Sequence, residues 1–573
     1  MQIKTQKNFL ILFIIIFGFD LLALTGGAAY LIHPAQYLFG NLYGYIILMA
    51  LLGNIVLAYL GGFTAKTVSP VKAAPADKSM RRYLDYCYLL MHIISMLLIP
   101  ILITLASSDA QNKTSQSIFV ICLYNFIFLF GAANAGLQIR NYFINRKSNP
   151  EKPEQNQSGG RGNVMRWIAV VFLCLCLVIG FYFSYIILGK STGNMIEVFI
   201  PEYAVFWGLQ MLGVSLLINR LRWRNNRSVL NKIILAAGII IFIICMVPLA
   251  SIPVTIRNAD AAYREAFGGS SLDDKTIDEK PGFMRHPFSL QDYFFGTRTF
   301  DYTVRENVLY YEGYYGKDAG IKLYFDAYMP LGDTELSAQN PVLIRIHGGA
   351  WTMGDKGFSN YAEVNKHFVN QGYVVFDIQY GLNDQNPSFA SSASPSNVKG
   401  NFDIDDMVRH IGIFTSYLSD HAGGYNADLN SVFISGGSAG GQLAIAAALG
   451  ITGGKYTDIL DPRLHVIGLI PFYPANSLSP NVGIGGTPDL IDPAALVDEY
   501  SPPCLIYHGT HDGIVNPKYA SILQNAYKEK SGAPCALLWM NFASHGSDFF
   551  TPGYYNQIFM YYMERFMNKY APL

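Results

Sequence analysis

The sequence predicts an N-terminal all-α transmembrane bundle of about seven spans, followed by a C-terminal α/β domain with a mostly parallel eight-stranded sheet. Apolar runs long enough to cross a membrane fill the first 254 residues and then stop. From residue 300 onward, short apolar runs alternate with helical patterns. We therefore expect a polytopic transmembrane domain over residues 1–254, a juxtamembrane connector over 255–299 and a second domain over 300–573.

The transmembrane domain is predicted from seven runs of about 20 or more residues, the length that crosses a hydrocarbon layer of ~30 Å. These runs are Phe9–Ile32, Phe39–Phe63, Tyr83–Leu105, Ser117–Ile139, Trp167–Gly189, Glu197–Asn219 and Ile233–Val254. The sixth run is the weakest, because it carries Pro201, Glu202 and Gln210. The first run is too long for a cleavable signal peptide, and further spans follow it.

Loop charge predicts the orientation of the spans, since Lys and Arg are retained on the cytoplasmic side. Eighteen of these residues lie in the N-terminal segment and in the second, fourth and sixth loops, whereas the alternate loops hold only Lys113 and Lys190. We therefore expect an integral protein of the cell membrane with a cytoplasmic N-terminus and, after an odd number of spans, an extracytoplasmic C-terminal domain. Without the sixth span, the basic cluster Arg220–Lys232 would lie on the wrong side, so charge favours that span.

Composition argues against several partners. The formal net charge is zero and residues 300–573 carry no basic stripe interleaved with aromatics, so nucleic acid is not an expected partner. Histidine and cysteine spacings match no metal-binding motif, and neither a metal nor a cofactor is expected. Five of the seven cysteines lie within spans. The other two, Cys504 and Cys535, fall on strands expected to be neighbours, where the geometry of parallel strands disfavours a disulfide.

Polar residues within or at the ends of the spans allow two interpretations. The set comprises Asp20, Asp85, His92, Asn125 and Glu202. Such groups are functional candidates by default, but they can also face the bundle interior and pair there. The second interpretation is favoured, because the sequence shows no repeat and no paired broken helices typical of a transporter.

Eight runs rich in β-branched and aromatic residues predict the strands of the second domain. They are Val308–Gly313, Ile321–Tyr328, Val342–Ile346, Tyr373–Ile378, Ser431–Ser435, Val466–Phe472, Cys504–His508 and Cys535–Met540. Helical patterns lie between most of them, at Ser359–Gln371, Phe402–His421, Ala439–Leu449 and Lys518–Lys530, and at the end, Tyr554–Lys569. This alternation predicts a sheet covered on both faces by helices, with ligands bound at the carboxyl ends of its strands.

A serine among glycines follows the fifth predicted strand. Gly436-Gly437-Ser438-Ala439-Gly440 matches the pattern G-x-S-x-G, in which the serine occupies a strained strand-to-helix turn. Small flanking residues are needed there because larger side chains would clash. A structural glycine-rich turn is the alternative. The strand "SVFIS" before the pattern and the Ala-rich helix after it favour a nucleophile elbow.

A second glycine-rich loop, "HGGAW", directly follows the third strand. Its backbone N–H groups can point at a developing oxyanion, where each donor contributes about 3–4 kcal/mol to transition-state stabilisation. The candidate donors are Gly348, Gly349 and Ala350, together with the N–H of Ala439. We expect His347 to anchor this loop, because it precedes the serine, whereas the chain order of such enzymes is serine, acid, histidine.

The same chain order selects the base and the acid. Only His545 follows both Ser438 and a plausible acid with a strand between them, and Asp512 directly follows the seventh strand. His508 and His511 are expected to be structural. Other acids lie in an insertion before the seventh strand, at Asp489, Asp492, Asp498 and Glu499. We expect His545 to take the proton of Ser438 and return it to the leaving group, while Asp512 fixes the imidazole tautomer.

In this order, the motifs resemble those of the α/β-hydrolase superfamily. They are "HGGAWTMGDK", "GGSAGGQLA", "HGTHDGIVNP" and "SHG", within a region from Phe300 to the C-terminus. Within the superfamily, the chain is most similar to the carboxylesterase group, which includes hormone-sensitive-lipase-like esterases, feruloyl-esterase-like enzymes, kynurenine formamidase and prenylcysteine methylesterases. The resemblance implies a Ser438–Asp512–His545 triad and an oxyanion hole in the 347–350 loop. HGGAW in place of HGGG, and Gly437 where the lipase-like branch commonly has Asp, favour the feruloyl-esterase and formamidase side.

The predicted function is that of a membrane-anchored serine carboxylic-ester hydrolase that forms an acyl-enzyme on Ser438. About 25 residues, Ala475–Glu499, separate the sixth and seventh strands. Such a short insertion favours a short or exposed acyl ester, from a small molecule or a lipid or envelope component. The Gly381–Asn401 loop is a second candidate wall of the pocket. The alternatives are a transporter or receptor whose hydrolase-like domain binds without turnover, and a serine peptidase, which the HGGAW loop disfavours.

Overall fold

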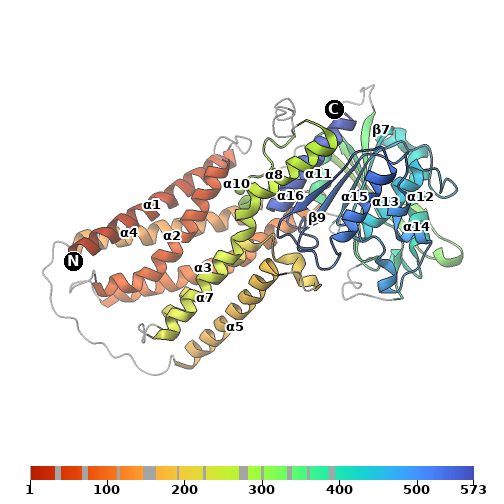
Figure 1. Ribbon diagram of the computed structural model, residues 1–573. Coiled ribbons are helices and arrows are strands. Elements are labelled where there is room, and N and C mark those ends of the chain that lie inside the picture. The colour runs from red at the N-terminus through yellow and green to blue at the C-terminus, as the bar shows by residue number, and fades with distance from the viewer. Residues whose placement is uncertain are drawn as a thin grey trace.

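The structure is a computed structural model. It describes residues 2–32, 40–67, 75–112, 117–145, 163–189, 193–222, 228–269, 280, 282–297, 302–331, 339–357, 362–385 and 394–573. Lys113, Lys190 and part of the basic charge that predicts the orientation lie outside the described residues, as does the polar loop between Asn145 and Asn163. Figure 1 shows a bundle of long helices beside a sheet that is covered by helices.

Within the described residues, seven helices are long and apolar enough to cross a membrane, which confirms that part of the prediction. They comprise α1 (Gln2–Ile32), α2 (Gly40–Thr67), α3 (Pro75–Ser108), α4 (Ile118–Asn145), α5 (Asn163–Leu188), α6 (Ala204–Leu221) and α7 (Val229–Cys245), which α8 (Val247–Phe267) continues. The sixth helix begins at Ala204 and not at Glu197. Its expected first turns form instead a separate 3-10 helix, η3 (Met195–Phe199), capped by Asn194 and followed by Pro201.

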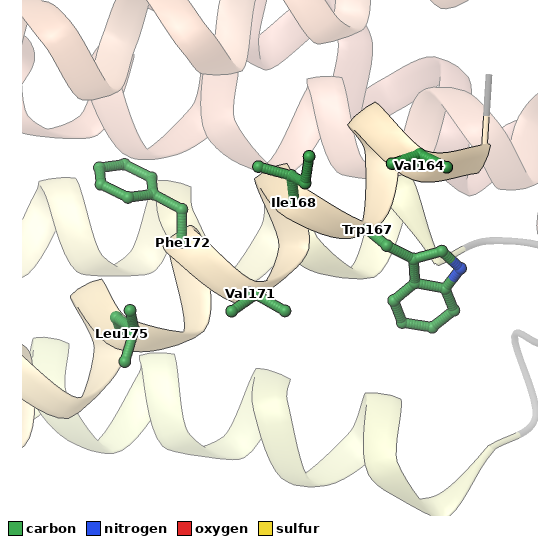
Figure 2. A pocket seen from close by; sticks show the side chains of 6 residues that line it. All are labelled: Val164, Trp167, Ile168, Val171, Phe172 and Leu175. Atoms are coloured by element: carbon green, nitrogen blue, oxygen red, sulfur yellow. The ribbon is translucent and has the colours of Figure 1, made fainter.

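The outward face of α5 is apolar. Figure 2 shows a hollow on this helix that is lined by Val164, Trp167, Ile168, Val171, Phe172 and Leu175. Val164 is 71% exposed and Phe172 is 64% exposed. A contiguous apolar surface of this kind is unfavourable in water and stable in a hydrocarbon layer. The exposed face therefore suggests that α5 inserts into a membrane.

Polar side chains of the bundle face its interior. The amide of Asn54 donates to the carboxylate of Asp20 over 2.6 Å. Arg220 of α6 forms an ion pair with Asp85 of α3, and both side chains are buried. Nε2 of His92 lies 3.3 Å from a backbone carbonyl oxygen of α6. Asp20, Asp85 and His92 therefore find partners within the bundle, as expected. Within the described residues, neither carboxylate oxygen of the buried Glu202 has a hydrogen-bond partner, which departs from that expectation.

The second body is built on an eight-stranded sheet of order β1-β2-β4-β3-β7-β8-β9-β10. Its strands are β1 (Tyr302–Glu312), β2 (Lys322–Pro330), β3 (Asn340–Ile346), β4 (Val374–Ile378), β7 (Ala427–Gly437), β8 (Val466–Phe472), β9 (Cys504–Gly509) and β10 (Cys535–Met540). A separate two-stranded sheet pairs β5 (Leu382–Asn383) with β6 (Lys399–Gly400). Each of the eight predicted strands corresponds to one strand of the large sheet.

The sheet is mixed, and the prediction of a mostly parallel sheet was wrong. β1 pairs antiparallel with β2, and β2 pairs antiparallel with β4, whereas the strands from β4 to β10 pair in parallel. The physical reason is the length of the connection between β1 and β2. Residues 313–321 are too few for the crossover that a parallel pair needs, so the two strands pair antiparallel. Longer crossovers, most of them helical, join the strands from β3 onward and allow parallel pairing.

Helices cover both faces of the sheet (Figure 1). One face carries α12 (Ile404–His421), α13 (Ala439–Thr452) and α15 (Lys518–Lys530), which share a core with the sheet. The other face carries α11 (Ala362–Asn370) and α16 (Tyr554–Tyr570), whose buried residues belong to the same core cluster as the bundle. The helix bundle therefore lies on the α11 and α16 side of the domain.

The segment between the last span and the sheet joins the two bodies through aromatic contacts. α8 extends to Phe267, whose ring packs on Phe566 of α16 with 5.1 Å between centroids. A short helix, α10 (Leu290–Phe295), contributes Tyr293, which stacks on Phe206 of α6 at 5.2 Å and on Tyr554 of α16 at 5.4 Å. Burial of large aromatic rings on both sides holds the two bodies together.

Candidate active site

Ser438 occupies a sharp turn between β7 and α13. Its backbone has φ 57° and ψ −121°, a strained conformation for a residue with a side chain. A Cβ on Gly436 would lie 2.3 Å from the carbonyl oxygen of Gly440, and a Cβ on Gly440 would lie 2.3 Å from that of Ile346. Glycine is therefore required two residues before and two residues after the serine, as the sequence pattern predicts.

Three side chains from the carboxyl ends of three strands meet at this turn. The hydroxyl of Ser438, after β7, is 3.0 Å from Nε2 of His545, which lies in the loop after β10. Nδ1 of His545 is 2.8 Å from Oδ2 of Asp512, which lies in the turn after β9. With the proton on Nδ1, Asp512 accepts from the imidazole and Nε2 is free to accept from the serine. The structure thus brings together the three residues that the sequence singled out.

The Asp512 carboxylate is held by several donors. Oδ1 accepts the backbone N–H groups of Ile514 at 3.0 Å and Val515 at 2.8 Å. Oδ2 also lies 3.4 Å from Nε2 of His508, a buried residue of β9. Burial alone would raise the pKa of Asp512, but His545 and His508 outweigh it and hold that pKa well below its usual range. Asp512 is therefore ionised wherever the protein is folded near neutral pH.

The competing acids lie elsewhere. Asp489 forms an ion pair with Lys455. Oδ1 of Asp498 accepts the backbone N–H of Tyr500 at 2.9 Å. In the part of the chain that the structure describes, the carboxylate that contacts His545 is that of Asp512.

Two further histidines lie near the site without contacting Ser438. The ring of His347 is buried and stacks on Tyr380 at 4.5 Å, with Nδ1 2.8 Å from the carbonyl oxygen of Gly348. Burial lowers the pKa of His347. His511 contacts the hydroxyl of Thr510 at 2.9 Å, and burial lowers its pKa as well. Both positions agree with the structural roles expected for them.

The loop after β3 lies directly against the serine. A Cβ on Gly348 would be 2.7 Å from the carbonyl oxygen of Gly437, so only glycine allows this close approach. Gly349 and Ala350 have φ of 118° and 51°. Within the described residues, no protein acceptor takes the backbone N–H of Gly349, Ala350 or Ala439. Unpaired, fixed N–H groups beside a serine can accommodate a negatively charged oxygen.

Trp351 fixes this loop to the helix that follows the serine. Its backbone is also at positive φ, 60°, and its ring is buried. The indole Nε1–H donates to Oε1 of Gln442, one turn into α13, over 2.9 Å. This bond ties the loop to the amino end of α13.

The sequence reasoning missed three residues around His545, namely Tyr473, Asp548 and His508, of which His508 contacts the acid. Tyr473, directly after β8, packs its ring 4.5 Å from that of His545 and donates its hydroxyl to Oδ1 of Asp548 over 2.6 Å. His508 contacts Asp512, although it was expected only to be structural. The position of Tyr473 at the carboxyl end of a strand was the available signal, because no motif contains it.

The predicted pocket walls are only partly described. The Gly381–Asn401 loop is visible at its two ends, and residues 386–393 lie outside the described residues. The segment between β8 and β9 is complete and carries one short helix, α14 (Pro488–Ile491), and two 3-10 turns, η10 (Ser479–Val482) and η11 (Pro493–Leu496). Cys504 and Cys535 lie opposite each other on β9 and β10 as free thiols.

Part of this domain matches a known family model. Residues 325–464 match the BD-FAE family model. The BD-FAE match includes the loop after β3, the Ser438 turn and α13, and it ends before Asp512 and His545. The expected resemblance to α/β-hydrolase esterases is confirmed.

The chain is also similar to a curated relative and to solved structures. The probable carboxylic ester hydrolase LipM of Mycobacterium tuberculosis is 24% identical over 238 residues, which is 38% of this chain and 51% of LipM. The match thus spans about half the length of that relative. Thermogutta terrifontis esterase 2, phosphorylated by paraoxon, is 22% identical over 48% of this chain and 98% of its own, with a TM-score of 0.38. A truncated carbohydrate esterase from gut microbiota is 20% identical over 46% of this chain and 96% of its own, with a TM-score of 0.34. The family match and LipM support an esterase-like hydrolase domain in this chain.

Proposed function

We propose that this protein is a membrane-anchored serine ester hydrolase that works through an acyl-enzyme on Ser438. The observation that carries the proposal is the continuous hydrogen-bonded chain from Ser438 through His545 to Asp512. A serine hydroxyl is a weak nucleophile at neutral pH, and a neighbouring base is what activates it. A histidine oriented by a buried carboxylate supplies such a base.

In the proposed reaction, Nε2 of His545 takes the hydroxyl proton while Oγ of Ser438 attacks the ester carbonyl. The carbonyl oxygen becomes an oxyanion, which the N–H groups of Gly349, Ala350 and Ala439 stabilise, and Gly348 lets the loop approach closely enough. The tetrahedral intermediate collapses, and His545 returns the proton to the departing alcohol. Ser438 now carries the acyl group.

Deacylation repeats these steps with water. His545 takes a proton from water, the resulting hydroxide attacks the acyl carbonyl, and the proton passes to Oγ of Ser438 as the acid leaves. Asp512 stays ionised throughout, since its pKa is held well below the usual range. It stabilises the imidazolium that forms in each half-reaction and keeps Nδ1 protonated between them.

A short or exposed acyl ester is the proposed substrate, either a small molecule or a component of a lipid or the cell envelope. Support comes from the segment between β8 and β9, which holds only short turns and one turn of helix where a large lid would enclose a long chain. The proposed topology has a cytoplasmic N-terminus and an extracytoplasmic hydrolase domain. It is supported by loop charge and by the side of the bundle on which the domain lies, next to the α3–α4 and α5–α6 connections.

A fluorophosphonate probe and a p-nitrophenyl ester test the proposal on the full chain in detergent. Wild-type protein should be labelled and should hydrolyse p-nitrophenyl butyrate, and Ser438→Ala should abolish both. Ser431→Ala, in the amino-terminal half of the strand that precedes Ser438, is the matched control and should retain both. Unlabelled wild-type protein that still binds ligands would support a binding role for the domain instead. Retained hydrolysis in Ser438→Ala would refute the acyl-enzyme.

The proposed topology has its own test. Protease added to intact cells or spheroplasts should cleave the hydrolase domain, whereas protection of that domain would contradict the charge argument.

A further inference from the structure

The segment that joins α5 to α6 lies against the loop that carries His545. The backbone carbonyl of Glu197, in η3, accepts the hydroxyl of Ser544 over 2.7 Å, although 347 residues separate them. Ser544 is buried and directly precedes His545. The side chain of Glu197 in turn accepts the backbone N–H of Asn194 at 2.9 Å, which fixes the start of the 3-10 turn.

The same turn also contacts the residue after His545. A Cβ on Gly546 would lie 3.0 Å from Cγ1 of Val198, so this glycine packs closely against the membrane domain. Gly546 has φ 64°, and Val198 is buried. The contact continues along the loop, where Tyr203 packs on Phe550 with 4.7 Å between ring centroids.

Contacts within the hydrolase domain orient the imidazole and hold one end of its loop, where the N–H of His511 donates to the carbonyl oxygen of Ala543 over 2.9 Å. Asp512 and Ser438 bind the two ring nitrogens, and Tyr473 packs against the ring face. The two neighbours of His545 in the chain, Ser544 and Gly546, also pack against η3. The membrane domain therefore adds contacts on both sides of His545 to those that the hydrolase domain makes.

We propose that residues Met195–Tyr203 of the membrane domain are a positioning element of the active site, which holds His545 in hydrogen-bonding distance of Ser438. This inference rests on the proposed hydrolase function. It goes further because it gives the bundle a part in turnover beyond anchoring. A displacement of reacting groups by about 1 Å is enough to lower a rate roughly 100-fold, so loss of this packing acts on kcat.

Two substitutions in the same 3-10 turn provide a matched test on the full chain in detergent. Val198→Ala removes two methyl groups from the buried contact with Gly546, whereas Ile196→Ala alters a side chain that is 53% exposed. We expect Val198→Ala to lower kcat for p-nitrophenyl butyrate about tenfold with KM unchanged within twofold. Ile196→Ala should keep both constants within twofold of wild type.

Ser544→Ala is a second variant, which removes one hydroxyl and its bond to Glu197. It should also lower kcat about tenfold, slow fluorophosphonate labelling by a similar factor and leave KM unchanged, since the substrate does not contact this residue. Thermal melting of each variant verifies that it is folded at the assay temperature. A lower kcat with unchanged KM in a folded variant indicates a positioning role and not a general loss of folded protein.

Several outcomes would overturn the inference. One is a kcat within twofold of wild type in both Val198→Ala and Ser544→Ala. Another is an equal loss in Val198→Ala and Ile196→Ala, and a third is a raised KM with unchanged kcat, which would indicate direct substrate contact. If wild-type protein is labelled at Ser438 while these variants are unaffected, the inference alone fails. If wild-type protein is not labelled at all, the proposed function fails.

Discussion

Adding one methyl group at Gly440 should separate the oxyanion loop from the serine. In Gly440→Ala the new Cβ would lie 2.3 Å from the carbonyl oxygen of Ile346 and 2.4 Å from that of His347. An ordinary carbon–oxygen contact is about 3.3–3.6 Å, so one of the two backbones must move by roughly 1 Å. Ile346 and His347 directly precede Gly348 and Gly349, so the displacement passes to the N–H groups that face Ser438.

The expected cost follows from that displacement. A misplacement of about 1 Å lowers rates roughly 100-fold, and loss of one oxyanion donor costs a similar or larger factor. We therefore expect Gly440→Ala to lower kcat for p-nitrophenyl butyrate about 100-fold. The same clash should lower the free energy of unfolding by about 1–3 kcal/mol, so a melting curve must verify that the variant is folded at the assay temperature.

The assay is steady-state hydrolysis by the full chain, together with the rate of fluorophosphonate labelling. Gly423→Ala is the matched control, since a Cβ at Gly423 would meet nothing within 4 Å. It should retain wild-type kcat. A folded Gly440→Ala protein whose kcat lies within threefold of wild type would refute the reasoning that the close approach of the two loops sets the geometry of the site.

Three further predictions concern the same site. Asp512→Asn should lower kcat about 10³–10⁴-fold with little change in KM, because an amide can donate to Nδ1 of His545 and stabilise the wrong tautomer. Asp498→Asn is the control and should keep wild-type kcat. Equal activity of the two variants would contradict the assignment of Asp512. The lowered pKa of Asp512 should keep this carboxylate ionised throughout the acid limb of log kcat/KM, so a slope of two in that limb would argue against the assignment. The same carboxylate stabilises the fold above the usual aspartate pKa of about 3.9, and this contribution is lost as pH falls through the lower folded pKa. Trp351→Phe should lower the free energy of unfolding by about 1–3 kcal/mol, because Oε1 of the buried Gln442 loses the indole N–H that donates to it. The measurement is the melting temperature, and an unchanged value would show that this hydrogen bond does not contribute to stability.

Sequence patterns reveal the parts of the site that local backbone geometry constrains. The turn at Ser438 needs glycine at Gly436 and Gly440, and this requirement is visible as a motif. Chain order then selects Asp512 and His545, which the structure places within hydrogen-bonding distance of each other. This arrangement can be anticipated because it depends on residues close together in the chain and on the order of strands.

Contacts between distant segments leave no comparable pattern. Tyr473 and Asp548 bond across 75 residues, and Ser544 bonds to Glu197 across 347, so neither contact follows from a motif. The mixed sheet was also missed, since the apolar pattern of β1 and β2 does not encode their direction. Pro201 was read as a weakness in a span, whereas it marks the segment that packs against the histidine loop.

The burial of α16 bears on how the protein is assembled. One side of this helix packs on the sheet, where Phe559 meets Phe472 at 4.7 Å, and the other side packs on α8, where Tyr562 meets Tyr263 at 5.6 Å. During synthesis, α8 emerges from the ribosome before the strands of the sheet, and α16 emerges after them. The last helix of the chain therefore packs on a membrane span that was made first. In a chain from which the spans were deleted, the aromatic side of α16 that packs on α8 would be exposed to water.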